Sequence, residues 1–319
     1  MASTLLKAGI AAAIFTSSIA SAAVAGQKRG SSSSCPAIWS QVASQLKRDF
    51  NGCNDLARSA IRFAFHDAAG YSSSNPQYAP ASGGADGSLL LNDVEVSRST
   101  ETPMKQKYRD PYLLPLYQKY KSQGVGAADL VQFAGAVGIK SCPGGPTVKT
   151  VVGRIDSSTA APQGTLPAAF GQGSDYNSLI QLWAAKGISP RELAALMGAH
   201  TVSMSFTNER YHIPPGGPQD SDPTVWDNNY FIQTQSQSSQ RQAQNSHTQG
   251  NNAHSGVYSF DSDVNLSNAT TECGQAFTEF ANNLNAWNAE FPAAMQKMSL
   301  FGIDQGTAAG FVDCTSLIS

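Results

Sequence analysis

Residues 61–71 read IRFAFHDAAGY and place Arg62 four positions before His66. Residues at i and i+4 project from one face of a helix, so these two side chains would lie side by side. The positive charge of an arginine disfavours protonation of a neighbouring histidine, which leaves a neutral base next to a permanent cation. Such a pair suits removal of a proton from a small bound acid and stabilisation of the negative charge that develops. The alternative is a core histidine beside an arginine that reaches solvent.

A second histidine lies near the end of the stretch ISPRELAALMGAHTV (188–202). Ser189 is a favourable N-cap, and Glu192 completes a capping box at the start of a helix. Apolar residues then repeat at helical spacing as far as His200. An iron porphyrin would explain both histidines, because one imidazole would bind the iron while the other stayed free beside a small molecule. Without a porphyrin, His200 is better explained as a core residue.

Carboxylates near both histidines indicate metal ligation. A metal-bound histidine needs an acceptor for its second ring nitrogen, and SFDSDVNL (259–266) offers Asp261 and Asp263. Each histidine is also followed by oxygen-bearing residues of the kind that calcium prefers, although an ordinary Asp-Gly turn explains GADGS (84–88) equally well. These residues are Asp67, Asp86 and Ser88 after the first histidine and Thr201, Asp220, Asp222 and Asp227 after the second.

The chain opens with an apolar leader. Residues 1–29 combine Lys7, an alanine-rich run and small residues that suit signal peptidase, and they end in a dibasic Lys28-Arg29. We therefore expect a signal peptide and pro-segment over 1–29, a secreted protein and no membrane span. Without the leader, 18 basic residues remain against 23 acidic ones, so the formal charge changes from -2 to -5. This balance argues against a nucleic-acid partner.

Residues 30–319 are enough for one domain with a single large core or two packed lobes. Besides the clearest helical pattern at 188–202, helices are indicated at 55–67, at 127–139 and in one long helix over 276–301. The stretch 233–256 is rich in Gln, Ser and Asn and has almost no apolar residues. We interpret it as a solvated insertion loop.

The five cysteines are widely spaced and lack the close pairs of a metal site. In an oxidising compartment, four of them can form two disulfides and one is left over. Asn265 and Asn268 each begin a sequon for glycosylation. The cysteines are Cys35, Cys53, Cys142, Cys273 and Cys314.

Taken together, these stretches resemble the secreted haem peroxidases of the plant, fungal and bacterial superfamily, and most closely the fungal class II group. The matching pieces include IRFAFHDA, GGADGSLLLN, ADLVQFAGAVGI, GRIDSSTAAPQGTLPAAF, ELAALMGAHTV and DSDPTVWDNNYF, in the family's order. The resemblance implies a mainly α-helical fold of two lobes, with one haem b between a distal and a proximal helical lobe. It also implies a monomer with two calcium ions and disulfides.

The resemblance assigns a role to each residue around the haem. The catalytic pair would take a proton from hydrogen peroxide, polarise the O–O bond and return the proton to the leaving oxygen. The oxidised enzyme would then take one electron from each of two small phenolic or similar donors. An acid beside the axial histidine would make its imidazole more electron-donating. In this sequence the catalytic pair is Arg62 and His66, the axial ligand is His200 with Asp263 as its acid, and Phe65 and Pro167 border the haem pocket.

The resemblance also implies the calcium ligands and the disulfide pairs. The first calcium would be bound by Asp67, Gly84, Asp86 and Ser88, and the second by Thr201, Asp220, Asp222, the Val225 carbonyl and Asp227. Cys53 would pair with Cys142 and Cys273 with Cys314, which leaves Cys35 without a partner.

The sequence departs from the family in its distal pocket and in its donor sites. The family usually holds its distal histidine with an asparagine, but SRSTETPM contains none, and Glu95 and Glu101 are the nearby acids that could replace it. Manganese-oxidising members use three acids where this chain has Asp55, Ser59 and Phe206, so only one of the three positions is acidic. Lignin-oxidising members expose a tryptophan at the position of Ala195. Small donors at the haem edge are therefore the expected substrates.

A different interpretation is a secreted, calcium-braced scaffold without peroxidase activity. A binding module has no need of Arg62, His66, His200 and Asp263 together, so their joint presence favours the enzyme. A zinc hydrolase is a weaker alternative still, because no HExxH or comparable spacing occurs.

Overall fold

The computed structural model describes residues 34–73, 82–206, 215–244 and 257–319. This part of the chain is mainly α-helical, which confirms the expected fold class, and its only named strands are a pair of two residues each. The expected leader over 1–29 lies outside the described residues. Among the described helices, none has the length and apolar character to cross a membrane.

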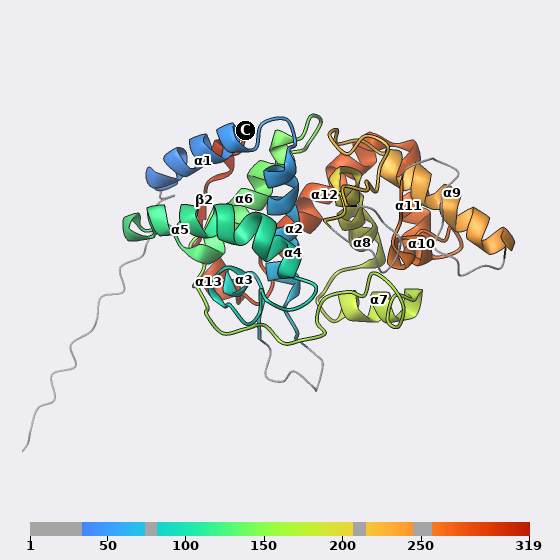
Figure 1. Cartoon of the computed structure of the whole chain (residues 1–319), viewed down its shortest axis with the longest axis horizontal. Coiled ribbons are helices and arrows are strands. Elements are labelled where there is room, and N and C mark those ends of the chain that lie inside the picture. Colours follow the sequence, from blue (N-terminus) through green and yellow to red (C-terminus); the bar gives the residue numbers. More distant parts are fainter. Residues whose placement is uncertain (1–33, 74–81, 207–214, 245–256) are drawn as a thin grey trace, which may run out of the picture. The chain divides into compact units, whose positions relative to one another are not determined.

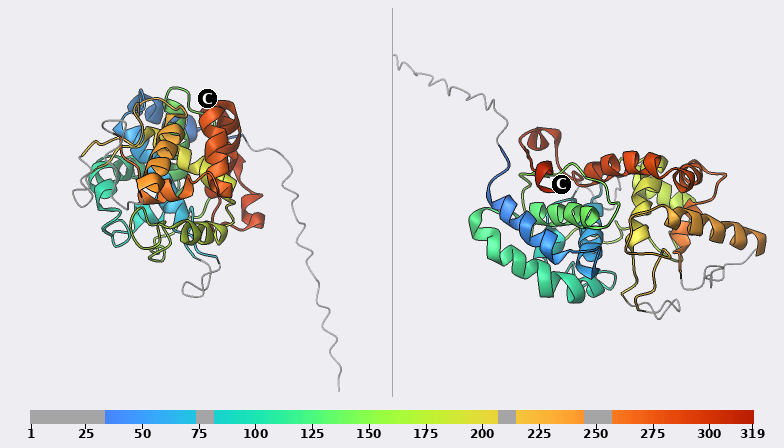
Figure 2. Two further views of the ribbon diagram at one scale, coloured as in Figure 1. Left: turned by 90° about the vertical axis from the view of Figure 1, so that its right-hand side faces the viewer. Right: turned by 90° about the horizontal axis from the view of Figure 1, so that it is seen from above.

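The helices form two groups that follow each other in the sequence (Figures 1 and 2). The N-terminal group comprises α1 (Ile38–Asp49), α2 (Asp55–Ala69), α3 (Ser88–Leu91), α4 (Thr102–Met104), the π-helix η2 (Lys105–Leu113), α5 (Leu114–Tyr120), the 3-10 turn η3 (Lys121–Gln123) and α6 (Ala127–Ser141). The C-terminal group comprises α7 (Tyr176–Ala184), α8 (Pro190–Met197), the 3-10 turn η4 (Gly198–Val202), α9 (Asn229–Gln244), α10 (Asp261–Leu266) and α11 (Glu272–Asn282). The next helix, α12 (Leu284–Met298), contacts both α2 and α8 and so joins the groups.

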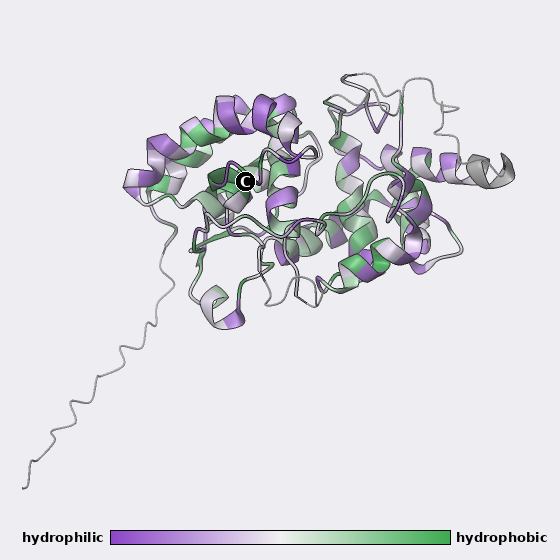
Figure 3. Ribbon diagram, turned by 60° about the horizontal axis from the view of Figure 1, so that its bottom comes forward, coloured by the Kyte–Doolittle hydropathy of each residue, from purple (hydrophilic) through white to green (hydrophobic). Residues whose placement is uncertain are grey.

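The packing of α2 on α6 forms the centre of the N-terminal group. Helix α6 is buried along almost its whole length, and its glycines let α2 approach closely. A Cβ atom at Gly135 would lie 2.6 Å from the Ala64 Cβ, and one at Gly138 would lie 2.7 Å from the Ala57 carbonyl oxygen. No side chain fits at either glycine, so these two contacts fix the position of the helix that carries Arg62 and His66. Figure 3 shows hydrophilic and hydrophobic residues interleaved along the outer helices.

Helix α8 positions the second histidine. The predicted capping box is present, since Ser189 and Glu192 each accept a hydrogen bond from the other's backbone N–H. After Met197 the chain tightens into η4, where a Cβ atom at Gly198 would lie 2.4 Å from the Trp287 ring of α12. The indole N–H of Trp287 donates to the Ala195 carbonyl at 2.9 Å. Helix α12 thus holds the turn that contains His200.

Two predicted elements differ from the structure. The long helix expected over 276–301 is interrupted at Asn283, whose extended backbone ends α11 and whose side chain caps α12 through the Ala286 N–H. Residues 233–244 of the expected insertion loop belong to α9, while 245–256 lie outside the described residues. The buried face of α9 includes Thr234, Gln237 and Ser238. Because the described buried residues of α9 from 233 on are polar, hydropathy did not indicate a helix there.

The C-terminal segment returns to the N-terminal group. It contains α13 (Gln305–Ala308), β2 (Val312–Asp313) and the 3-10 turn η6 (Thr315–Leu317), and β2 pairs antiparallel with β1 (Val151–Val152). The turn η6 also contacts α1.

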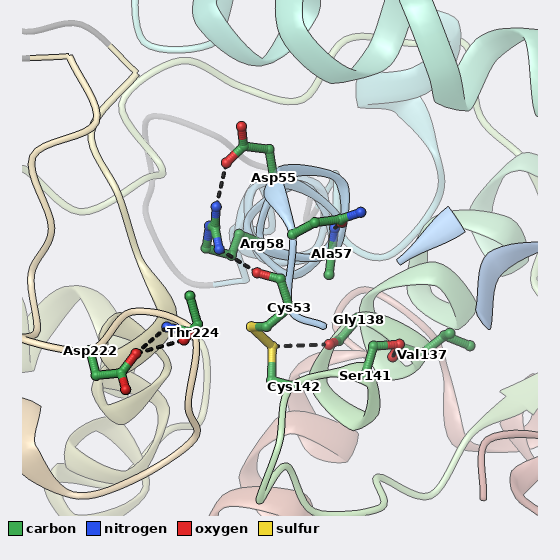
Figure 4. Close-up of a disulfide and its surroundings, with 11 residues drawn as sticks. Cys53, Asp55, Ala57, Arg58, Val137, Gly138, Ser141, Cys142, Asp222 and Thr224 are labelled. Carbon is green, nitrogen blue, oxygen red and sulfur yellow. Dashed lines mark hydrogen bonds and ion pairs between the residues drawn. A yellow bond between two sulfur atoms is a disulfide. The ribbon is translucent and has the colours of Figure 1, made fainter. Parts of the chain in front are cut away.

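The position of the C-terminal segment determines which cysteines form disulfides. The expected Cys53–Cys142 bridge is present and joins the start of α2 to the end of α6 (Figure 4). The expected Cys273–Cys314 bridge is wrong, because Cys314 is bonded to Cys35 and Cys273 is a free, buried thiol in α11. The family position suggested the wrong partner, since β2 and η6 carry Cys314 to α1 and away from α11.

We expect mass spectrometry of a non-reducing digest to find a peptide pair that links Cys35 to Cys314. Cys273 should react with an alkylating reagent only after unfolding, because it is buried. Cys314→Ser should lower the free energy of unfolding by about 2–5 kcal/mol, since it releases a very long loop. A Cys273–Cys314 peptide would contradict the structure.

Candidate active site

A cavity of about 850 Å³ is lined by residues from both groups of helices. Its volume is in the range of cofactor and ligand sites. Five residues that the sequence singled out line it together: Arg62, Phe65, His66, Pro167 and His200. Much of the remaining wall is apolar and includes Leu196, Met197, Phe260 and Met295.

On the wall formed by α2, the His66 imidazole lies between the Glu101 carboxylate and the Arg62 guanidinium. Its Nδ1 lies 2.9 Å from both carboxylate oxygens of Glu101, and Arg62 donates from Nε to His66 Nε2 at 3.3 Å. This arrangement places the imidazole proton on Nδ1 and leaves the lone pair of Nε2 beside the guanidinium. Of the two acids that the sequence offered here, Glu101 is therefore the partner. Glu95 instead accepts a hydrogen bond from the Ala161 N–H at 2.9 Å.

The charges of this wall balance one another. Burial alone would raise the pKa of Glu101, but attraction to His66 and Arg62 outweighs it and lowers that pKa below its ordinary value. Glu101 is only 2% exposed and is therefore a buried carboxylate. Burial also lowers the pKa of Arg62, which Glu101 and Tyr258 partly offset. The Arg62 guanidinium lies over the Phe206 ring, 5.5 Å from its centroid.

Phe65 forms an aromatic part of the same wall. Its ring stacks on that of Trp183 with centroids 6.0 Å apart and meets the His66 ring edge-on at 4.9 Å. Trp183 belongs to α7, so this contact also connects the two groups of helices. The imidazole of His66 is thus confined by an aromatic face as well as by its hydrogen bonds.

His200 lies against a buried amide–carboxylate pair. Its Nδ1 is 3.4 Å from an Asp263 oxygen and 3.4 Å from the Gln219 amide nitrogen. Gln219 donates to the other Asp263 oxygen at 2.9 Å, and the Phe260 N–H donates to that oxygen at 3.2 Å. Asp263 is fully buried, and the rings of Tyr230 and Phe260 meet the imidazole edge-on.

The first oxygen cluster lies directly behind His66 on α2. Asp67 is fully buried and accepts hydrogen bonds from the Gly87 and Leu89 N–H groups at 3.1 and 3.2 Å. Burial and the neighbouring Asp86 raise the pKa of Asp67 well above its ordinary value. The Ser88 hydroxyl is buried without a hydrogen-bond partner in the described chain. Gly84 has φ +125° and packs against the Phe301 carbonyl, where no side chain fits.

The second oxygen cluster follows His200. The Thr201 hydroxyl donates to Asp220 at 2.8 Å and lies 3.4 Å from Asp227. Burial and the nearby Asp227 raise the pKa of Asp220 to about 6. The backbone N–H of Asp222 donates to Asp220, and that of Val225 donates to the Asp222 carbonyl. In the described ranges, no group of three or more His, Cys, Asp or Glu is arranged to hold a metal.

The two sequons differ in accessibility. The Asn265 amide donates to the Ser174 carbonyl at 2.8 Å, and the next two residues, Leu266 and Ser267, are buried. Asn268 is followed by exposed residues, and its side chain bonds only the local turn through Thr270. The geometry therefore favours Asn268 as the acceptor.

The sequence missed two residues of the site. Gln219 and Tyr258 carry no motif, and only the fold brings Gln219 to Asp263 and Tyr258 to the cavity wall. Glu101 was one of two candidates, because a separation of 35 positions in the sequence does not show which acid lies beside His66. The stretch SFDSD offered both Asp261 and Asp263, and the family resemblance pointed to Asp263, which lies 3.4 Å from His200 Nδ1.

The residues present fit a porphyrin. The cavity wall is largely apolar, a free imidazole with a guanidinium stands on one side, and a second imidazole backed by a carboxylate stands on the other. A helical fold with this site defines a haem enzyme that acts on a small molecule.

Comparison with known proteins identifies the family. A family model described as Peroxidase matches residues 40–283. The chain is 29% identical over 281 residues to manganese peroxidase 3 of Phlebia radiata, which covers 85% of this chain and 72% of the relative. It is 27% identical over 304 residues to a peroxidase of Arthromyces ramosus, a match that covers 92% of this chain and 78% of the relative. It is 30% identical over 277 residues to manganese peroxidase H4 of Phanerodontia chrysosporium, a match that covers 83% of this chain and 68% of the relative. The chain belongs to the peroxidase family, within its fungal class II haem enzymes.

The lowered pKa of Glu101 predicts a pH-dependent contribution to stability. A carboxyl whose folded pKa is depressed stabilises the fold above its unfolded pKa of 4.5, and this stability is lost as the pH falls through the folded pKa. Glu101→Gln should therefore be less stable than the parent by about 1–3 kcal/mol at pH about 5, and the difference should shrink at pH about 3. Urea unfolding at both pH values measures it. A stability difference between the variant and the parent that is the same at both pH values would contradict an ionised Glu101.

Proposed function

We propose that this peroxidase uses hydrogen peroxide to oxidise small phenolic or similar donors at the edge of the cavity. The observation that carries the proposal is the Arg62–His66 pair in the cavity wall, where Glu101 binds Nδ1 of His66 and the lone pair of Nε2 faces Arg62. Membership of the peroxidase family supports the use of hydrogen peroxide. The class of donor is our own inference from the shape of the site.

The chain's own residues would move one proton and stabilise one charge. His66 takes a proton from one peroxide oxygen at Nε2, while Glu101 holds the proton already on Nδ1. Arg62 stabilises the negative charge that develops on the other oxygen as the O–O bond breaks. His66 then returns its proton to that oxygen, and water leaves.

The haem would be bound between the two histidines. It would supply the two electrons that cleavage of the O–O bond consumes and would recover them one at a time from the donors. His200 is the proposed axial ligand, with its Nδ1 proton held by Asp263. Phe65 and Pro167 border the pocket on the side of His66.

The donor sites of specialised relatives find no match in this chain. Ser59 is buried, Phe206 packs under Arg62, and Asp55 is paired with Arg58 (Figure 4). Three carboxylates for manganese are therefore not available at these positions. Ala195 is buried inside α8, where no aromatic side chain could face solvent. Donors must then be small enough to reach the cavity itself.

We further infer a secreted, monomeric enzyme of one domain, residues 30–319, with Asn268 as its glycosylated residue. Two disulfides support an oxidising compartment. The net negative charge argues against a nucleic-acid partner.

We also propose two calcium ions, one in each oxygen cluster. Buried oxygens that bind a cation need its positive charge to compensate them. The unpartnered Ser88 hydroxyl and the raised pKa values of Asp67 and Asp220 mark oxygens of this kind. Calcium also uses hydroxyl and carbonyl ligands, so two or three acids in each cluster suffice.

Hydrogen peroxide should react quickly with the haem-loaded protein. His66→Ala should bind haem normally but react about 10²–10⁴-fold more slowly, because it lacks the base. His200→Ala should instead lose haem. Stopped-flow absorption in the Soret region measures both effects. A protein that binds no haem, or binds it and ignores peroxide, would favour the calcium-braced scaffold instead.

Removal of calcium should destabilise the enzyme. Chelation should lower the thermal midpoint by at least about 5 °C, since a bound ion contributes a few kcal/mol to stability. Asp220→Asn should weaken one of the two sites and reduce the calcium content measured by atomic emission. Full stability in excess chelator, with no calcium in the purified protein, would refute this proposal.

A further inference from the structure

The acid behind His66 is unusual for this family. An asparagine usually stands there, and an amide can orient an imidazole but adds no charge. In this chain Glu101 occupies the place, with both oxygens 2.9 Å from Nδ1. The difference between an amide and a carboxylate changes the electrostatics of the base and not only its position.

The Glu101 carboxylate is firmly held. It is 2% exposed, its backbone lies immediately before α4, and its N–H donates to the Arg98 carbonyl at 2.9 Å. The Thr100 hydroxyl donates to one of its oxygens at 3.1 Å. A smaller cavity of about 290 Å³ borders Glu101 and His66 and is also lined by Glu95 and Arg98.

Two opposite charges flank the imidazole. The Arg62 guanidinium, 3.3 Å from Nε2, opposes the arrival of a proton on that atom. A carboxylate at Nδ1 favours the same proton, as the aspartate does in a Ser-His-Asp triad. Without a negative charge on the far side, the arginine that stabilises the leaving oxygen would also weaken the base.

We propose that Glu101 is a positioning residue that gives His66 a compensating negative charge as well as an orienting hydrogen bond, so that proton removal from the incoming ligand depends on a carboxylate. This inference rests on the proposed function, because it assumes that His66 acts beside a bound haem. It predicts that Gln, which keeps the hydrogen bond and removes the charge, does not substitute for Glu.

Hydrogen cyanide tests the proposal without peroxide turnover, because it too must lose a proton as it binds the haem iron. The association rate is followed by the Soret shift of the ferric protein. Glu101→Gln should slow association at least about tenfold. In a His66→Ala background the same substitution should have no further effect, because the base through which it acts is gone.

Two controls separate charge from structure. Glu95→Gln removes a buried acid of the same segment that bonds Ala161 and not His66, and it should leave the rate within about twofold. Glu101→Asp and Glu101→Asn shorten the side chain equally and differ only in charge. The Asp variant should be the faster of the two, and this pair serves if Glu101→Gln does not fold.

Equal rates for the Gln variant and the parent, or for Asp and Asn, would overturn the proposal and leave Glu101 with an orienting role alone. Failure of the proposed function would look different. In that case the ferric protein would bind cyanide with the Glu101 dependence described, yet would not react with hydrogen peroxide.

Discussion

The contact between α2 and α6 is the constraint on which the site depends. Gly135 and Gly138 bring the two helices so close that α2 cannot shift or rotate without a clash. One helix can then serve two purposes. His66 faces the cavity, and the next residue, Asp67, accepts hydrogen bonds from Gly87 and Leu89 at the start of α3. The distal wall and the first oxygen cluster are therefore parts of one rigid element, which explains why calcium would matter to a site it does not touch.

Each histidine is controlled by a carboxylate at Nδ1, but the two carboxylates differ in their other contacts. The Glu101 oxygens receive hydrogen bonds from His66 and Thr100, close to a guanidinium. Asp263 shares its oxygens with Gln219 and the Phe260 N–H, and it lies 3.4 Å from His200. The distal acid thus acts mainly on one imidazole, whereas the proximal acid is divided among several donors. This contrast suits a base on one side and a neutral ligand on the other.

Local patterns in the sequence predicted the local features of the fold. The i and i+4 spacing placed Arg62 beside His66, and the capping box at Ser189 set the start of α8. Features that depend on long-range contacts were not predictable in the same way. Cys314 reaches Cys35 only because β2 pairs with β1, and Glu101 reaches His66 across 35 positions of sequence. Hydropathy did not indicate the part of α9 that follows Ile232, because its described buried residues are polar.

The central claim is that one histidine binds the haem iron and the other stays free as a base. Electron paramagnetic resonance of the ferric, haem-loaded protein tests it most directly, with His66→Ala beside the parent. We predict a high-spin spectrum for both, since only His200 would be bound to iron. A low-spin spectrum of the parent that becomes high-spin in His66→Ala would show that both imidazoles bind the iron, and it would contradict the account.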